Sequence, residues 1–375
     1  MSTRRVDPVL LWAFLLLTGI GLVMVYSASA VAAEHRTGEP LRYLLAQLGA
    51  AGIGLMAMLA CIQLGSERLR HLAPLALLVA IALLCLVFLP GIGVTANGAT
   101  RWVRLGVLSF QPSEVAKPAV VLYLAWTLSR KGDDKVRSLG GGFLGPGLLA
   151  GIPILLILMQ PDFGTAVTLS FVVGVLLFLA GTRMRYLGLA AMMAVPAAVY
   201  LVVATPYRMR RVLAFLDPWA TRDDAGYQVA ESLISIGAGG VTGLGLGDGR
   251  QKLFFLPEAH TDFIFSILGE ELGLLGVVAV LLLFGLIVWR GLRAAYRAET
   301  RFGAYLALGL TTLLALQAVL NMAVAMGLLP TKGLALPFLS YGGSSLVISL
   351  AMAGVLLGLS AEEGGFLRPS PGVRR

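Results

Sequence analysis

Apolar residues gather into ten runs along the chain, and short stretches rich in Gly, Pro or charged residues separate them. Most runs have roughly the 17 to 25 residues that an α-helix needs to cross a bilayer. The pattern therefore predicts an all-α polytopic membrane protein with about ten transmembrane helices. The only long polar segment, about residues 205–262, is expected to form a loop between the seventh and eighth spans. The predicted spans are residues 9–30, 41–63, 72–90, 114–129, 144–160, 164–181, 186–204, 263–289, 302–327 and 342–360.

The composition agrees with a membrane protein, because 58% of the 375 residues are hydrophobic and only 13% are charged, whereas soluble domains carry about 25% charged residues. We expect one integral membrane domain over residues 1–375, with a short disordered tail at about residues 362–375. The net charge of +9 comes from basic residues scattered between the apolar runs, which argues against a nucleic-acid partner. Both cysteines lie in apolar runs, so no disulfide framework or cysteine metal site is predicted.

The distribution of basic residues predicts the orientation. With an even number of spans and both termini in the cytoplasm, seventeen lysines and arginines lie on the inner side and six in the short outer segments. Such an excess is typical of the cytoplasmic face. The polar stretches 91–113, 205–262 and 328–341 then lie on the outer face, so any chemistry is expected there or within the membrane.

The first outer stretch combines a turn, a cationic and aromatic cluster and a charged pair. Residues 97–98 suit a tight turn, and Arg101 and Trp102 follow it. Glu114 and Lys117 are three residues apart at the start of a predicted helix, so they can meet on one helical face. A structural ion pair is the simpler interpretation of these two, since charges within spans usually pair.

Further charged residues punctuate the other outer stretches. Asp162 lies in a short turn between two spans, where turn chemistry alone can account for it. Arg208, Arg210 and Arg211 open the long loop against the usual charge bias, which suggests phosphate binding, with contact to lipid headgroups as the alternative. Lys332 lies in a segment interrupted by Pro and Gly; it either snorkels to the interface or meets an anionic substrate.

The long loop contains a Gly-rich stretch at residues 237–249 and ends in the densest cluster of candidate chemistry. The glycines suit either a flexible loop or one that hugs the membrane. Glu258, His260 and Asp262 fall within five residues, immediately before an apolar run. Asp262 is a candidate general base, and the alternative is that it caps the next helix. Glu258 and His260 are candidates for orienting the loop.

Five motifs resemble one family: PEAHTDFIFSILGEELG, FQPSEVAK, QPDFGTA, PYRMRR and PTKGLALPFLSYGGSS. In order and over nearly the whole chain they are similar to the SEDS family (shape, elongation, division, sporulation), and to its division branch more than to its elongation branch. The resemblance implies a ten-span peptidoglycan glycosyltransferase that polymerises lipid II on the outer face of the bacterial cytoplasmic membrane. It also implies a class B penicillin-binding protein (a transpeptidase) as partner, together with other division or elongation proteins, and it identifies Asp262 with the family's essential outer-loop aspartate.

This activity needs a carboxylate to take the acceptor proton and cations to stabilise the leaving pyrophosphate. Asp262 is the predicted base, and the glycan chain passes from one undecaprenyl pyrophosphate to the 4-hydroxyl of another lipid II. No cofactor is required by the pattern, and Mg²⁺ or Mn²⁺ stays open. The cation candidates are Arg101, Arg208, Arg210, Arg211 and Lys332, and the supporting residues are Trp102, Glu114, Lys117, Asp162, Glu258 and His260.

Three alternatives to a division polymerase remain at this point. An elongation-type polymerase would share every motif. A lipid II flippase or other transporter would also have many spans with charges inside the membrane. A non-catalytic scaffold that recruits the transpeptidase would not depend on the carboxylate of Asp262.

Overall fold

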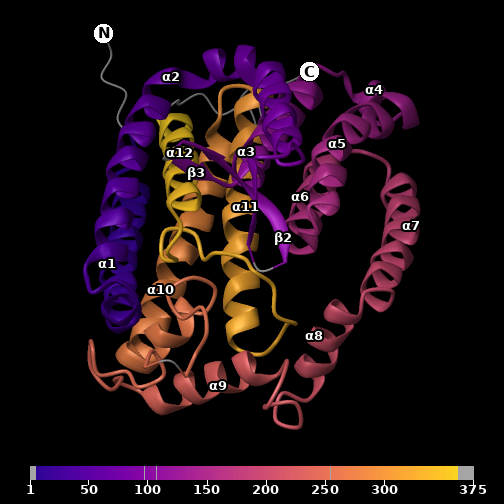
Figure 1. Ribbon diagram of the computed structural model, residues 1–375. Helices are drawn as coiled ribbons and strands as arrows, with labels where there is room; N and C mark the ends of the chain where they lie inside the picture. Colours follow the sequence, from indigo (N-terminus) through magenta and orange to yellow (C-terminus); the bar gives the residue numbers. More distant parts are fainter. Residues whose placement is uncertain (1–5, 97, 107, 254, 362–375) are drawn as a thin grey trace.

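The computed structural model describes residues 6–96, 98–106, 108–253 and 255–361, and most of them are helical. Figure 1 shows the long helices side by side, with α8 and α9 across one end of the bundle. The helices are α1 (Pro8–Thr37), α2 (Arg42–Leu86), α3 (Pro112–Ser129), α4 (Asp133–Val136), the π-helix η1 (Leu139–Leu144), α5 (Gly145–Met159), α6 (Phe163–Leu179), α7 (Met184–Val203), α8 (Pro206–Leu216), α9 (Tyr227–Gly239), α10 (Ile264–Arg297), α11 (Arg301–Ala325) and α12 (Gly343–Ser360).

The long apolar helices confirm the polytopic class. Among the described residues, seven helical segments are long and apolar enough to cross a membrane, and α6 is a shorter apolar helix. One of the seven, α2, has 45 residues and is interrupted at Gly65, whose φ of 68° is not helical. Its two arms match the second and third predicted spans. The count of ten spans stays a prediction, because α3 and α6 do not meet the same criterion of length and hydropathy.

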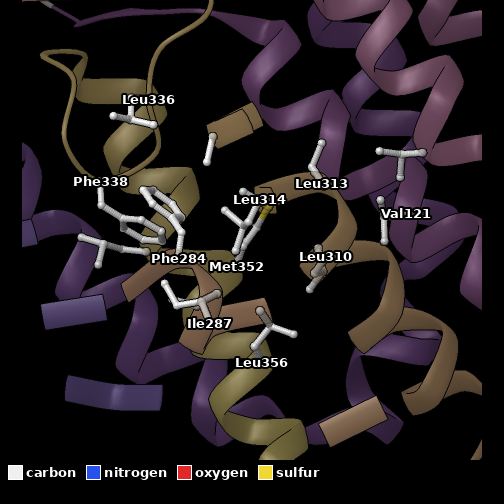
Figure 2. Close-up of a cluster of buried hydrophobic side chains, with 14 of the residues drawn as sticks. Val121, Phe284, Ile287, Leu310, Leu313, Leu314, Leu336, Phe338, Met352 and Leu356 are labelled. Atoms are coloured by element: carbon white, nitrogen blue, oxygen red, sulfur yellow. The ribbon is translucent and has the colours of Figure 1, made fainter. Parts of the chain in front are cut away.

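The core of the bundle surrounds α11, in which 67% of the residues of the most apolar stretch are buried. Figure 2 shows side chains from five parts of the chain meeting there: Val121 of α3, Phe284 and Ile287 of α10, Leu310, Leu313 and Leu314 of α11, Leu336 and Phe338 of the segment before α12, and Met352 and Leu356 of α12. In a membrane, moving such side chains from lipid into the protein interior gains little hydrophobic free energy. Close packing is therefore the main source of helix association. The segment that leads into α12 is thereby fixed against the bundle.

A small antiparallel sheet departs from the all-α prediction. Strands β1 (Gly93–Ala96), β2 (Ala99–Leu105) and β3 (Leu108–Phe110) pair in that order. Val94 lies opposite Trp102, and Ala96 opposite Ala99. Asn97, half of the predicted turn, lies outside the described residues, as does the predicted disordered tail at residues 362–375. The Asn-Gly pair between alternating residues was the available hairpin signal.

The predicted loop at residues 205–262 is largely folded. It contains α8 and α9, and its Gly-rich stretch lies against the first turns of α10. The amides of Leu244 and Gly245 donate to the carbonyls of Glu270 and Glu271 at 3.0 Å, and the amide of Leu274 donates to Gly240 at 2.9 Å. The interpretation of residues 237–249 as a flexible loop is therefore wrong: the glycines are needed for close approach to a helix.

The beginning of α1 and the end of α12 lie at the same end of the bundle. The amide of Asp7 donates to Ser360 Oγ at 3.1 Å, and Arg290 Nη1 of α10 contacts the Asp7 carboxylate at 2.9 Å. Figure 1 shows α8 and α9 at the opposite end. The folded part of residues 205–262 therefore covers the end of the bundle that is farther from the termini.

Candidate active site

One cavity of about 650 Å³ collects most of the predicted site residues from distant parts of the chain. Its wall is built by β2, the start of α3, the turn before α6, α8, the segment before α10, and the segments before and at the start of α12. The predicted residues that line it are Arg101, Trp102, Glu114, Lys117, Asp162, Arg208, Arg211, Glu258, Asp262 and Lys332. The fold thus brings together residues that are up to 231 positions apart, from Arg101 to Lys332.

Asp262 faces this cavity and does not cap α10. The N-cap of α10 is Phe263, and it has no side-chain capping bond. Within the described residues the Asp262 carboxylate forms no hydrogen bond or ion pair, whereas its main-chain carbonyl accepts from Asn321 Nδ2 at 2.9 Å. Gly333 lies so close that a Cβ there would stand 3.5 Å from Asp262 Oδ2. The capping alternative is therefore wrong, and the carboxylate is free to act on a ligand.

Burial raises the pKa of Asp262 from its ordinary value of 3.8 to about 7, and the nearby charges of Glu258 and Asp162 act in the same direction. Arg211 and Arg101 oppose this rise in pKa. A carboxylate in apolar surroundings is destabilised relative to its neutral form, which is why its affinity for a proton increases. The Asp262 carboxyl is thus poised to exchange a proton near neutral pH.

The segment before Asp262 is an irregular turn that other segments hold in place. Glu258 adopts a φ of 56°, and its Oε2 accepts from Thr261 Oγ1 at 2.7 Å. The ring of His260 packs against Tyr43 and Tyr341 at centroid distances of 4.9 and 5.6 Å, and its pKa is lowered chiefly by burial. His260 is not part of the cavity wall. Its contacts suit an orienting role better than proton transfer.

Arginines with a guanidinium partly anchored by main-chain carbonyls line the cavity. Arg101 donates to Gln160 at 3.3 Å and to Pro161 at 2.6 Å. Arg211 donates to Thr331 at 3.1 Å. Arg208 donates to Leu201 at 3.0 Å. Anchoring of one nitrogen in Arg208 and Arg211, and of two in Arg101, leaves the other donors of each guanidinium available for an anion, at a reduced entropy cost.

Arg210 and Lys332 differ from these three arginines in their surroundings. Arg210 is exposed and is absent from the cavity wall, so its grouping with Arg208 and Arg211 is wrong. The reason is that α8 is a helix, in which consecutive side chains point in directions about 100° apart. Lys332 is half-buried and, in the described part of the chain, its ammonium forms no ion pair or hydrogen bond. Burial lowers its pKa below the ordinary 10.5.

The remaining predicted residues have structural partners within the cavity wall. Lys117 Nζ contacts Glu114 Oε1 at 2.8 Å, with side chains 2% and 11% exposed, which confirms the predicted ion pair. The Asp162 carboxylate accepts from the amide and the hydroxyl of Thr165, at 3.2 and 2.8 Å, and thereby caps α6. Trp102 sits on β2, beside Arg101. These residues shape the cavity and add charge to its wall.

Glu270 and Glu271 do not line the cavity, and both have partners inside the protein. Glu271 Oε1 contacts Lys252 Nζ at 2.6 Å and accepts from Ser27 Oγ at 2.7 Å. Glu270 Oε1 accepts from the amide of Arg250 at 2.8 Å. The two carboxylates thus fasten the segment between α9 and α10 to α10 itself.

Several polar residues of the site were missed in the sequence. Gln317, Ser344 and Ser345 line the cavity, Thr261 holds Glu258, and Asn321 holds Asp262. Gln317 and Asn321 are polar residues four positions apart in an apolar run, so they lie on one face of the helix. This spacing was the available signal. No such signal marks the serines.

The donor set for a protein-bound metal is incomplete. Within residues 6–96, 98–106, 108–253 and 255–361, no group of three or more His, Cys, Asp or Glu side chains could hold a metal ion. Mg²⁺ and Mn²⁺ favour several oxygen ligands. The carboxylates of the cavity therefore do not fit a dedicated metal site of their own.

The chain matches known proteins over almost its full length. The model of a family described as "Cell cycle protein", comprising FtsW, RodA and SpoVE, matches residues 8–364. A relative from Geobacter sulfurreducens, named "Probable peptidoglycan glycosyltransferase FtsW", is 47% identical over 362 residues, covering 96% of this chain and 97% of the relative. A relative of the same name from Geobacter sp. is 48% identical over 365 residues, covering 96% and 99%.

Solved structures agree with these matches. A chain from the structure described as "Structural coordination of polymerization and crosslinking by a peptidoglycan synthase complex" superposes with a TM-score of 0.78 at 33% identity, covering 95% of this chain and 98% of that one. The rod shape determining protein RodA of Thermus thermophilus gives a TM-score of 0.71 at 30% identity, covering 95% and 97%. Both levels of identity are high enough for the likeness to extend beyond the fold.

Proposed function

Because the chain belongs to the FtsW, RodA and SpoVE family of cell cycle proteins, we propose that it is a peptidoglycan glycosyltransferase that polymerises lipid II. One observation carries this proposal from the residues themselves. Asp262, an unpaired carboxyl with a pKa of about 7, faces a cavity that is also lined by Arg101, Arg208, Arg211 and Lys332. A base beside a group of cations is what glycosyl transfer from a pyrophosphate requires.

In the proposed step, the Asp262 carboxylate takes the proton of the acceptor 4-hydroxyl. The acceptor oxygen then forms a bond to the anomeric carbon of the growing chain as the bond to the pyrophosphate oxygen breaks. The electron pair of the broken bond leaves with undecaprenyl pyrophosphate. A base with a pKa near the working pH combines a large ionised fraction with good proton affinity.

The cations supply stabilisation where negative charge develops. Arg211 and Arg101 lie close enough to Asp262 to lower its pKa, so the leaving pyrophosphate and the base are neighbours in the proposed complex. Lys332, without a partner in the described structure, loses solvation on burial and regains a counter-ion when an anion enters. Oriented donors in a water-poor site contribute strongly to such reactions.

The same comparisons support a proposal for the cellular setting. The relatives above carry the name FtsW, which supports the division branch, and we place this activity at the division septum on the outer face of the cytoplasmic membrane, with both termini inside. The peptidoglycan synthase complex among the similar structures couples polymerization to crosslinking. We accordingly propose a class B penicillin-binding protein as the crosslinking partner of this chain.

A polymerisation assay separates this function from the alternatives. Purified protein in detergent, with labelled lipid II and no second compartment, is expected to produce glycan strands, and addition of the transpeptidase is expected to increase the yield. A flippase or a scaffold would leave the lipid II monomeric in both conditions. An elongation-type enzyme would respond to the elongation transpeptidase in preference to the division one.

The two neighbouring arginines of α8 provide a matched pair for the cation role. Arg211→Gln is expected to weaken lipid II binding by about 10- to 100-fold, as loss of a hydrogen bond to a charged group typically does. Arg210→Gln is expected to stay within about twofold of wild type, because Arg210 is exposed outside the cavity wall. Binding of labelled lipid II to the two purified variants measures the difference. Equal losses would mean that both arginines act as headgroup anchors.

A further inference from the structure

Asn321 lies on α11 behind the cavity wall and is 2% exposed. Its Nδ2 group donates two hydrogen bonds, to the carbonyl of Asp262 at 2.9 Å and to the carbonyl of Leu334 at 2.6 Å. One side chain therefore joins the segment that carries Asp262 to the segment that carries Lys332. Neither segment belongs to a regular helix or strand at this point.

Both partners of Asn321 are carbonyl acceptors, so the amide nitrogen with its two protons is the group that must face them. The Oδ1 atom is buried and has no hydrogen-bond partner in the described structure. A buried acceptor without a partner is unfavourable. The hydrogen bonds of this side chain therefore come from its two donors and not from its acceptor.

Ser340 makes a second connection between the same two segments. Its hydroxyl donates to the carbonyl of Thr261 at 2.6 Å and accepts from the amide of Leu336 at 2.8 Å. Next to it, the amide of Tyr341 donates to the carbonyl of His260 at 2.9 Å. Three successive carbonyls, those of residues 260, 261 and 262, are thus held from the side of α11 and the segment before α12.

We infer that Asn321, supported by Ser340, is a positioning residue that sets the Asp262 carboxylate relative to the cation Lys332. This inference rests on the proposed function, since it assigns a purpose to Asp262. The physical reason is that residues 258–263 form an irregular turn in which the amides of Thr261 and Phe263 both donate to Glu258. Such a turn has no regular pattern of main-chain hydrogen bonds. Its position therefore depends on hydrogen bonds from neighbouring segments. Misplacement of a reacting group by about 1 Å can cost about 100-fold in rate.

Two variants of Asn321 distinguish a donor role from simple packing. Asn321→Leu keeps the branched shape but has no donors, whereas Asn321→Ala leaves space for a water that can donate to both carbonyls. If the donors matter, Asn321→Leu is the slower enzyme; if packing matters, Asn321→Ala is. We expect kcat to fall about 10- to 100-fold in Asn321→Leu, with less change in KM because the arginines of the cavity stay in place.

The pH profile supplies a readout that a purely structural role would not move. The charged groups facing Asp262 are Glu258, Asp162, Arg211 and Arg101, and Lys332 shares the cavity. None of them is removed by a change at Asn321. If the turn loosens, water reaches the Asp262 carboxylate and its pKa falls toward the ordinary value, so the acid limb of the rate profile shifts to lower pH.

The experiment compares polymerisation of labelled lipid II by wild type, Asn321→Leu, Asn321→Ala, Ser340→Ala and Thr311→Val, together with thermal unfolding of each purified protein in detergent. Thr311 is a buried residue of α11 whose hydroxyl also has no partner among the described residues, so Thr311→Val should match wild type. A wild-type rate and an unshifted acid limb in Asn321→Leu would overturn the inference, as would a rate for Asn321→Ala below that of Asn321→Leu, or a slower rate with no shift of the acid limb in any variant. If Asn321→Leu does not fold, Ser340→Ala decides, and a wild-type rate with an unshifted acid limb in that variant would overturn the inference. Activity of Asp262→Asn in the parallel assay would instead overturn the proposed function.

Discussion

Asp262→Asn is expected to abolish measurable glycan elongation while leaving the protein folded. Loss of a general base typically lowers a rate by about 10² to 10⁴-fold. Asparagine has nearly the shape of aspartate but accepts no proton. The substitution breaks no contact in the described structure, because the Asp262 carboxylate has no hydrogen-bond or ion-pair partner there. Polymerisation of labelled lipid II by equal amounts of the two purified proteins tests this result.

The same variant is expected to be more stable than wild type above pH 7. The pKa of Asp262 is raised from 3.8 to about 7, so the folded state binds the proton more tightly than the unfolded state does. The contribution of protonated Asp262 to the free energy of unfolding is therefore fully present below about pH 4, and it is lost as the pH rises through 7. Asparagine cannot ionise, so the unfolding temperatures of the two proteins should differ at pH 8 and agree at pH 4.

An Asp262→Asn protein of normal abundance that still elongates glycan chains would contradict the role of Asp262 as the base.

Gly239→Ala is expected to prevent normal folding of the segment between α9 and α10. A Cβ at this position would lie 2.0 Å from the carbonyl oxygen of Gly269 in α10, which is main chain and cannot turn aside. Overpacking of a tight contact typically costs about 1–3 kcal/mol, and more where the backbone has to move. The same displacement would carry residues 258–262 away from the cavity. We expect little folded protein and no polymerisation, measured by size-exclusion profile, thermal unfolding and activity.

Gly237 supplies the matched control on the same helix. Nothing lies within 4 Å of a Cβ built at Gly237, and alanine is favoured over glycine within a helix by up to about 1 kcal/mol. Gly237→Ala should therefore be neutral or slightly stabilising, with wild-type activity. Similar behaviour of the two variants would indicate that α9 does not pack against α10 in the way described.

The sequence predicted the helices well because a bilayer demands long apolar runs, and those runs are visible without tertiary information. It predicted Asp262 because the residue closes a polar segment just before such a run. It did not predict the strands around Trp102, since a hairpin of a few residues within an outer stretch leaves a weak pattern. For residues 237–249 it left a flexible loop and a membrane-hugging loop as alternatives, because glycine composition does not distinguish a mobile loop from a close contact such as that between Gly239 and Gly269.

The sequence named most residues of the cavity, but their arrangement and supporting contacts could not be predicted, for a geometric reason. Which arginine faces the cavity depends on the helical phase of α8, and that separates Arg211 from Arg210 although they are adjacent. The partnership of Asn321 with Asp262 depends on the place where α11 passes behind the segment before α10. Both are properties of packing between elements, and they carry no periodicity of their own.

The position of α7 has a consequence for how the chain can evolve. None of its twenty residues is buried in the described structure, so lipid, rather than neighbouring side chains, sets the requirements on this helix. Outside positions such as Leu187, which packs against the core, exchange of one apolar residue for another there leaves no buried void. The sequence of α7 is thus free to drift among apolar residues while those of α3 and α11 are held by their neighbours, and identity with distant relatives should be lost first along this helix.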